Sequence, residues 1–190
     1  MQQATDPRIA RTRQFIMDAF VELSSKKEFK DITVKDLTEA AQINRSTFYY
    51  HFEDIYDLLD KALTEFLSVN LSYRDFEDSV ISEETLMKMF EAITTFQASL
   101  SHRCYRGYED TIARIIRDQL EVIFIHMLEN QFPDNEKIGL KRTASLLGWG
   151  LYGLSAEWRN DHEEISPEDF IKPALPYLLN INQGLSMGNS

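Results

Sequence analysis

The sequence has little cysteine, proline and glycine: one cysteine, five prolines and seven glycines among 190 residues. Cys104 has no partner for an internal disulfide, so a disulfide-stapled secreted scaffold is excluded and a reducing compartment is favoured. The longest apolar run, Val122–Ile125, is far shorter than the ~18 residues that a membrane span requires. Residues 1–13 hold no apolar stretch of the kind found in signal peptides. We therefore expect a cytoplasmic protein without a membrane partner.

Charge is distributed unevenly along the chain. The formal net charge is −11. Counting side chains gives eight basic and seven acidic residues over 1–51, and twelve basic and twenty-four acidic residues over 52–190. Bulk acidity disfavours nucleic acid as a partner, but a near-neutral N-terminal segment joined to an acidic body keeps that partner open.

The spacing of proline and glycine predicts an all-α fold. Between Pro7 and Pro133 there is no proline and one glycine, Gly107, whereas a β-rich chain of that length needs many tight turns. Apolar residues at helical spacing predict helices over 7–25, 33–41, 45–51, 54–72, 82–102, 109–131 and 136–159. Ser166 begins a last helix, in which Pro173 and Pro176 predict a kink or a restart.

Two short helices separated by Gln42, Ile43 and Asn44 form a helix-turn-helix candidate, which can place its second helix in a DNA major groove. Thr33 and Asp36 predict a capping box for the first helix, and Asn44 predicts the N-cap of the second. The apolar residues expected to hold both helices on helix 7–25 are Leu37, Ala40, Ile43, Phe48 and Phe52.

The polar residues of the second helix have the chemistry of DNA contacts. Arginine can grip guanine, Ser and Thr can approach base edges, and Tyr and His can bind phosphates. We expect DNA contacts from Arg45, Ser46, Thr47, Tyr49, Tyr50 and His51. Lys35 is a candidate phosphate contact, and Thr33 is a cap, a phosphate donor or both. Arg8, Arg11 and Arg13 are either DNA contacts or solvated charges.

The run ITVKDLTEAAQINRSTFYYHF, residues 32–52, resembles the DNA-binding segment of the TetR/AcrR family of bacterial transcriptional regulators. The matching pieces are Thr33-Val34, Ala40-Ala41, Ile43-Asn44-Arg45, residues 47–52 and Leu58-Leu59, and the similarity covers about residues 8–63. Two positions depart from the family. Gln42 replaces its usual turn glycine, so residue 42 need not be left-handed, and Glu53 and Ile55 lie where lysine commonly reaches the phosphate backbone.

The resemblance implies a homodimer that binds a palindromic operator in double-stranded DNA. Residues 1–52 would form a three-helix DNA-binding domain, and residues 53–190 a larger helical bundle that binds a small-molecule effector and dimerises. A repressor released from its operator by that effector is the expected mode. The apolar residues expected at the dimer interface are Leu147, Leu151, Leu154, Tyr177, Leu178 and Leu179. The alternative function is a helical protein-interaction module that docks a protein partner.

Other patterns favour structural roles. The glycines of residues 148–153 match a dinucleotide fingerprint, but they fall in a predicted helix with no preceding strand, so close helix packing is the better interpretation. His102, Cys104 and His126 lack regular metal-ligand spacing. No catalytic constellation is present, and we therefore expect no enzyme activity, no cofactor and no metal. The many aromatic residues after residue 64 are mostly core, and some are candidates for an effector pocket.

Overall fold

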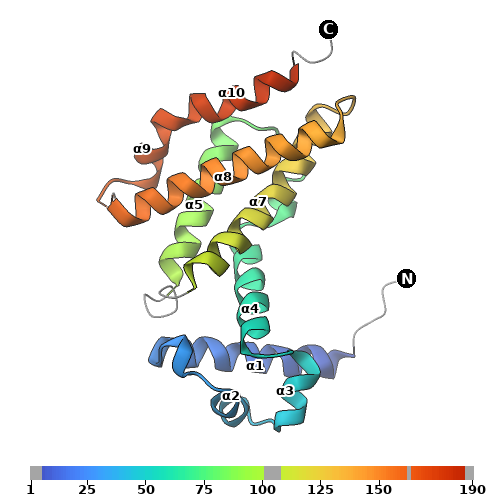
Figure 1. The fold of residues 1–190 in the computed structure, drawn as a ribbon, viewed down its shortest axis with the longest axis vertical. Coiled ribbons are helices and arrows are strands. Elements are labelled where there is room, and N and C mark those ends of the chain that lie inside the picture. Colours follow the sequence, from blue (N-terminus) through green and yellow to red (C-terminus); the bar gives the residue numbers. More distant parts are fainter. Residues whose placement is uncertain (1–5, 101–107, 162–163, 187–190) are drawn as a thin grey trace. The chain divides into compact units, whose positions relative to one another are not determined.

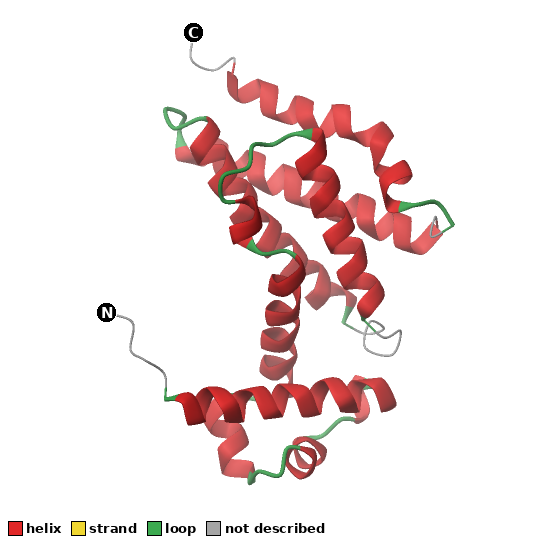
Figure 2. Cartoon of the chain, turned by 180° about the vertical axis from the view of Figure 1, so that it is seen from behind, coloured by secondary structure: helices red, strands yellow, loops and turns green. Residues whose placement is uncertain are grey.

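The computed structural model describes residues 6–100, 108–161 and 164–186, and these ranges contain helices and no strand (Figures 1 and 2). The predicted all-α class is confirmed. None of the described helices is long and apolar enough to span a membrane. His102, Cys104 and the expected end of helix 82–102 lie outside the described residues.

The helices begin and end close to the predicted positions. The first half of the chain holds α1 (Pro7–Lys26), η1 (Phe29–Asp31), α2 (Val34–Ala40), α3 (Arg45–His51), α4 (Ile55–Asn70) and η2 (Tyr73–Phe76). The second half holds α5 (Glu83–Ser99), α7 (Glu109–Gln131), α8 (Lys137–Asp161), α9 (Pro167–Ile171), η3 (Lys172–Ala174) and α10 (Leu175–Ser186). The break from α9 through η3 to α10 confirms the restart predicted at the two prolines.

The chain forms two compact units. The N-terminal unit comprises residues 1–64 and 100–109, and the C-terminal unit comprises residues 65–99 and 110–190. The structural boundary therefore falls inside α4 rather than between residues 52 and 53. The reason is that Leu58, Leu59 and Leu63, on the part of α4 that precedes residue 65, are buried and belong to the N-terminal unit. The functional division at residues 52 and 53 stays a prediction.

A small apolar core holds α1, α2 and α3 together in the N-terminal unit. Its fully or almost fully buried members include Ile16, Phe20, Leu37, Phe48 and Phe52. Three of these, Leu37, Phe48 and Phe52, belong to the set predicted to hold the helix-turn-helix in place, and their burial confirms that part of the prediction.

Ala40 was expected in this core and is exposed. Because α2 ends at Ala40, this side chain lies at the edge of the core, where it lines a shallow groove of about 310 Å³ with Phe15 and Gln42. The buried positions of α2 are Leu37 and Thr38. Ile43 is half-buried.

An aromatic cluster that the sequence did not predict joins η1 to residue 108 within the N-terminal unit. The Phe29 ring lies 4.2 Å from the Tyr108 ring, 5.6 Å from the Tyr56 ring and 5.9 Å from the Phe20 ring, measured between centroids. Phe29 is buried, whereas Tyr56 is exposed. The cluster therefore extends the small core of α1 to α4.

The core of the C-terminal unit is built by longer helices. The stripe along α7 includes Ile112, Ile116, Leu120, Ile123 and Phe124, all fully buried. Helix α8 contacts α5, α9 and α10 (Figure 1), so several of its faces are covered.

Of the glycines of α8, Gly150 supports the predicted close packing, whereas a β-carbon at Gly148 would make ordinary van der Waals contact. A β-carbon at Gly148 would lie 3.6 Å from Leu120 Cβ, and one at Gly150 would lie 3.0 Å from Leu178 Cδ2. At Gly153 a β-carbon would meet no atom within 4 Å, so the packing interpretation fails there. The segment is helical throughout, which agrees with rejecting a dinucleotide loop.

The apolar set expected at a dimer interface needs correction. Leu147 and Leu151 are fully buried inside the C-terminal unit, and Leu178 is also buried. They face the protomer core because α8 packs against several helices, and periodicity alone cannot tell which of its apolar stripes points inward. The large exposed apolar side chains of α8 and α10 include Ile138, Leu146, Trp149 and Tyr177.

Candidate nucleic-acid interface

The turn between α2 and α3 is held by backbone hydrogen bonds. Ile43 N–H donates to Thr38 O at 3.0 Å, and Gln42 N–H donates to Glu39 O at 3.3 Å. Gln42 has φ of 54°, which places it in the left-handed region. The sequence left open whether residue 42 is left-handed, and the structure shows that Gln42 adopts the conformation that glycine favours. The strain of a non-glycine residue there is of order 1–3 kcal/mol.

Asn44 begins α3 as the predicted N-cap. Its side-chain oxygen accepts from Thr47 N–H at 2.8 Å, which satisfies an amide that the helix itself leaves unpaired. The cap matters more here than in a long helix, because α3 spans only seven residues and has few hydrogen bonds of its own.

Phe48 and Phe52 orient α3 on the core. Both rings are buried, and their centroids lie 5.8 Å apart. The remaining face of α3 therefore stays at the surface. The six residues predicted to contact DNA lie together on this helix: Arg45, Ser46, Tyr49 and Tyr50 are exposed, and Thr47 and His51 are half-buried. The structure brings the predicted set together, and its contact with DNA stays a prediction.

Tyr49 positions the side chain of Arg45. Arg45 Nη2 donates to Tyr49 Oη at 3.3 Å, and the guanidinium lies 5.7 Å from the centroid of the same ring. The sequence indicated both residues as separate contacts and did not predict this pairing. A guanidinium held by a neighbouring ring loses less side-chain entropy when it binds a base edge.

Thr33 acts as the cap of α2. Its hydroxyl accepts from Asp36 N–H at 3.2 Å and donates to Asp36 Oδ2 at 2.8 Å, and its own N–H donates to that carboxylate at 2.9 Å. Both hydrogen-bond donors of Thr33, its backbone N–H and its hydroxyl, are thus used within the capping box. The structure therefore favours the role of helix cap over that of phosphate donor. Lys35 is exposed, and its ammonium lies 3.8 Å from Glu39.

Asp36 closes the capping box and binds Lys27 at 2.9 Å. The hydrogen bond from the Lys27 ammonium, followed by those from the Thr33 amide and hydroxyl, lowers the pKa of Asp36 from its ordinary 3.8 to about 2. The start of α2 is therefore charged and paired at neutral pH.

His51 ends α3 as a neutral group at physiological pH. Burial lowers the pKa of its imidazole, and the nearby charge of Arg13 lowers it further. Arg13 also lies 5.8 Å from the Phe52 ring centroid, which places this arginine beside the end of α3.

The acidic residues that follow α3 cap the next helix. Asp54 Oδ1 accepts from Tyr56 N–H and Asp57 N–H, each at 2.8 Å. Asp57 in turn accepts from Glu53 N–H at 3.0 Å and from the Lys61 ammonium at 2.8 Å. Asp54, which lies between Glu53 and Ile55, therefore has a structural role as the cap of α4.

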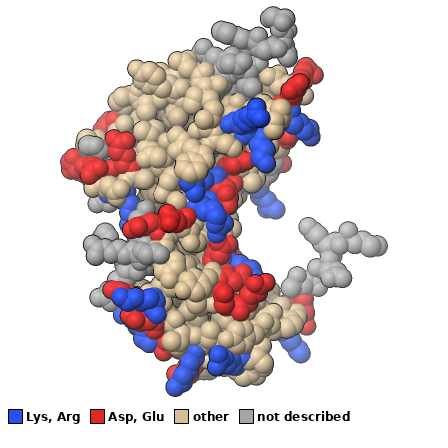
Figure 3. All heavy atoms as spheres, viewed as in Figure 1, with Lys and Arg blue, Asp and Glu red and all other residues tan. Residues whose placement is uncertain are grey.

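The surface of the N-terminal unit is mixed in charge. In the view of Figure 3, lysine and arginine side chains alternate with acidic ones over this unit and form no continuous basic patch. The short α2, its turn and the outward polar row of α3 nevertheless define a helix-turn-helix protein of the DNA-binding class.

Comparison with known proteins finds a family match in the N-terminal part of the chain. The sequence profile of the bacterial regulatory proteins of the TetR family matches residues 16–62. The HTH-type transcriptional regulator YxbF of Bacillus subtilis, itself uncharacterised, is 24% identical over 174 residues, which are 88% of this chain and 45% of that protein. The chain thus spans less than half the length of this curated relative.

Solved structures share the fold over nearly the whole chain. A TetR-family regulator from Streptomyces coelicolor has a TM-score of 0.64 at 14% identity, covering 95% of this chain and 99% of that one. The TetR-family repressor AlkX from Dietzia sp., implicated in biodegradation of n-alkanes, has a TM-score of 0.58 at 18% identity, covering 90% and 97%. Residues 16–62 thus match the DNA-binding domain of the TetR family, and the fold over nearly the whole chain is that of TetR-family transcriptional regulators.

Proposed function

We propose that this chain binds a palindromic operator in double-stranded DNA as a homodimer and represses transcription until a small-molecule effector releases it. The observation that carries the proposal is the exposed polar row of α3, held outward by the buried rings of Phe48 and Phe52. The proposed DNA contacts are those six α3 residues together with Lys35. Thr33 contributes by capping α2.

In a two-fold dimer, operator binding depends on the distance between the two recognition helices. The recognition helices of a dimer enter half-sites ~34–36 Å apart, so a shift of a few ångströms misaligns one of them. An effector bound by the C-terminal unit would release the operator by producing such a shift. This sequence of events takes place in the cytoplasm and needs no metal, cofactor or catalytic residue.

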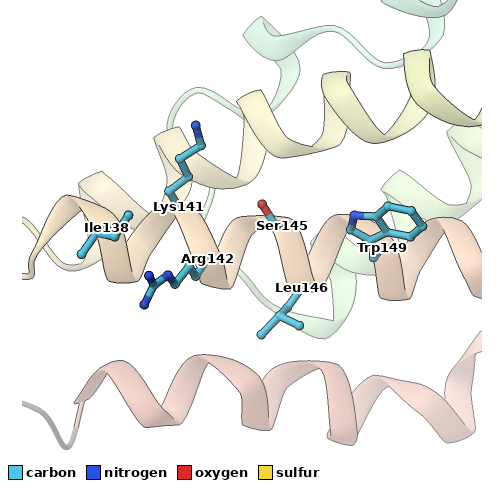
Figure 4. A pocket seen from close by; sticks show the side chains of 6 residues that line it. All are labelled: Ile138, Lys141, Arg142, Ser145, Leu146 and Trp149. Atoms are coloured by element: carbon cyan, nitrogen blue, oxygen red, sulfur yellow. The ribbon is translucent and has the colours of Figure 1, made fainter.

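The face of α8 and α10 with exposed apolar side chains is our proposed dimer surface. Leu146 and Trp149 are each 60% exposed, and Tyr177 is 76% exposed. An open groove of about 560 Å³ along α8 is lined in part by Leu146 and Trp149, and Leu146 points from α8 toward the ribbon of α10 (Figure 4). The Arg117 guanidinium lies 3.7 Å from the Trp149 ring centroid, which supports that ring from the α7 side.

A gel shift with the DNA upstream of the chain's own gene tests the proposal. We expect one retarded complex whose affinity falls steeply as salt rises, because lysine and arginine displace counterions from the phosphates. Failure to bind any short palindrome at low salt would contradict it.

The alternative of a protein-docking module is not favoured by the match to a DNA-binding domain. It remains distinguishable by experiment. A stoichiometric protein partner in a pull-down, with no retention on an operator or heparin column, would replace the proposed function.

A further inference from the structure

Asn44 Oδ1 accepts three hydrogen bonds at the start of α3. The donors are Thr47 N–H at 2.8 Å, Thr47 Oγ1 at 2.8 Å and Ser46 Oγ at 2.7 Å. Only the first of these is needed for an N-cap. The other two involve hydroxyl groups that the sequence assigned to base recognition.

The chemistry of the three bonds fixes where the hydroxyl protons lie. A backbone N–H can only donate, so the Asn44 atom that it meets must be the carbonyl oxygen and not the amide nitrogen. A carbonyl oxygen can only accept, so Ser46 and Thr47 must each give their hydroxyl proton to it. What remains on each hydroxyl oxygen is its two lone pairs, so toward a ligand the oxygen can only accept.

An oxygen that only accepts cannot bind a phosphate, because phosphate oxygens are acceptors too. It is also mismatched to guanine O6 and thymine O4 in the major groove, since both are acceptors. It matches the exocyclic amino groups of adenine N6 and cytosine N4, which are donors. An unconstrained hydroxyl would contact either kind of base by rotating its proton.

We infer that Asn44 sets the base specificity of Ser46 and Thr47: each selects adenine or cytosine, and rejects guanine or thymine, at the base that it contacts. The inference rests on the proposed function. Asn44 is a positioning residue here, since it acts through the two hydroxyl groups.

Selection of bound sequences from a random DNA pool, with the full-length chain and its variants, tests the inference. Ser46→Ala and Thr47→Val each remove one hydroxyl, so a base preference that they abolish marks the contacted position. Asn44→Gly removes the acceptor and frees both hydroxyls, while glycine remains a tolerable N-cap. Asn44→Asp is the matched control, because its carboxylate keeps the acceptor.

Every base pair carries one amino group in the major groove, on its adenine or its cytosine, so the contact is tested by removing that amino group from the base at each marked pair. The wild-type chain should bind the unmodified operator about fivefold or more tightly than the operator without the amino group, and this is the ratio compared among the variants. Asn44→Gly should reduce that ratio to below about twofold, because a freed hydroxyl pairs with acceptors as well as donors. Asn44→Asp should keep the ratio and lower affinity uniformly, since its charge repels the phosphates.

Three results would overturn the inference: binding that is unaffected when the amino group of a marked pair is removed, an unchanged ratio in Asn44→Gly, or no position that responds to Ser46→Ala or Thr47→Val. Each of these leaves the proposed function intact if the wild-type chain still selects a palindrome. Selection of no sequence at all by the wild-type chain would instead defeat the proposed function and the inference with it.

Discussion

The two units of the chain reach stability by different means. In the N-terminal unit, α2 and α3 span seven residues each, and both begin at a side-chain cap, Thr33 or Asn44. In the C-terminal unit, α7 spans 23 residues and α8 spans 25, and their length allows long apolar stripes. Short helices depend on local signals because they are too short to be stable alone. The helix caps that stabilise the N-terminal unit are visible in the sequence. The same short segment carries the predicted DNA contacts, so the function of this unit could be predicted from its sequence.

Removing a core ring gives the largest expected effect. Phe48→Ala should destabilise the N-terminal unit by roughly 3–5 kcal/mol, because it leaves a cavity beneath α3. Amide hydrogen exchange should then show lost protection in α1 to α3 and retained protection in α7 and α8. Phe124→Ala in α7 is the matched control and should give the reverse pattern. Equal loss in both units by either variant would show that they unfold as one.

Loss of Arg45 should affect DNA binding and leave folding unchanged. Arg45→Ala is expected to weaken operator binding by roughly 1–3 kcal/mol and to relax specificity at one base pair. Titration against a series of single-base operator variants measures both effects. Arg114→Ala removes the same charge from the C-terminal unit and serves as control. A loss that is equal for every DNA sequence would make Arg45 a phosphate contact.

The capping box should make the stability of the N-terminal unit depend on pH. Because the pKa of Asp36 is about 2 in the folded chain and 3.8 ordinarily, its contribution is complete above pH 3.8 and is lost as the pH falls toward 2. Asp36→Asn should cost about 1 kcal/mol at pH 7 and remove this component. Urea unfolding at pH 5 and pH 3 measures it. If the wild-type chain and Asp36→Asn lose the same free energy of unfolding between pH 5 and pH 3, Asp36 is not the source of the pH dependence.

The smallest expected effect lies in the turn. Gln42→Gly should stabilise the N-terminal unit by about 0.5–1 kcal/mol, since relief of left-handed strain exceeds the entropy gained by the unfolded chain. Gln42→Ala keeps a β-carbon and should bring no such gain. Thermal unfolding of the three proteins compares them, and equal midpoints would mean that the turn stores no strain.

The sequence predicted local structure well and tertiary contacts less well. Caps at Thr33 and Asn44, and the prolines after Ile171, act on their own neighbours, so their effects could be read directly. The aromatic cluster around Phe29 joins residues far apart along the chain, and no local pattern indicates it.

The candidate site shows the same limit. Burial of Phe48 and exposure of the polar row followed from helical spacing, whereas the pairing of Arg45 with Tyr49 and the triple acceptor role of Asn44 depend on rotamers. Leu147 and Leu151 were assigned to the wrong surface because α8 is apolar on more than one side.

Methylation protection of a selected operator tests most directly whether α3 reads the major groove. The account predicts two groups of protected guanines, at N7 in the major groove, centred about 10–10.5 base pairs apart or a multiple of that spacing. It also predicts that Arg45→Ala loses one protected guanine in each group. DNA that is bound with no major-groove protection, or with protection unchanged by Arg45→Ala, would contradict it.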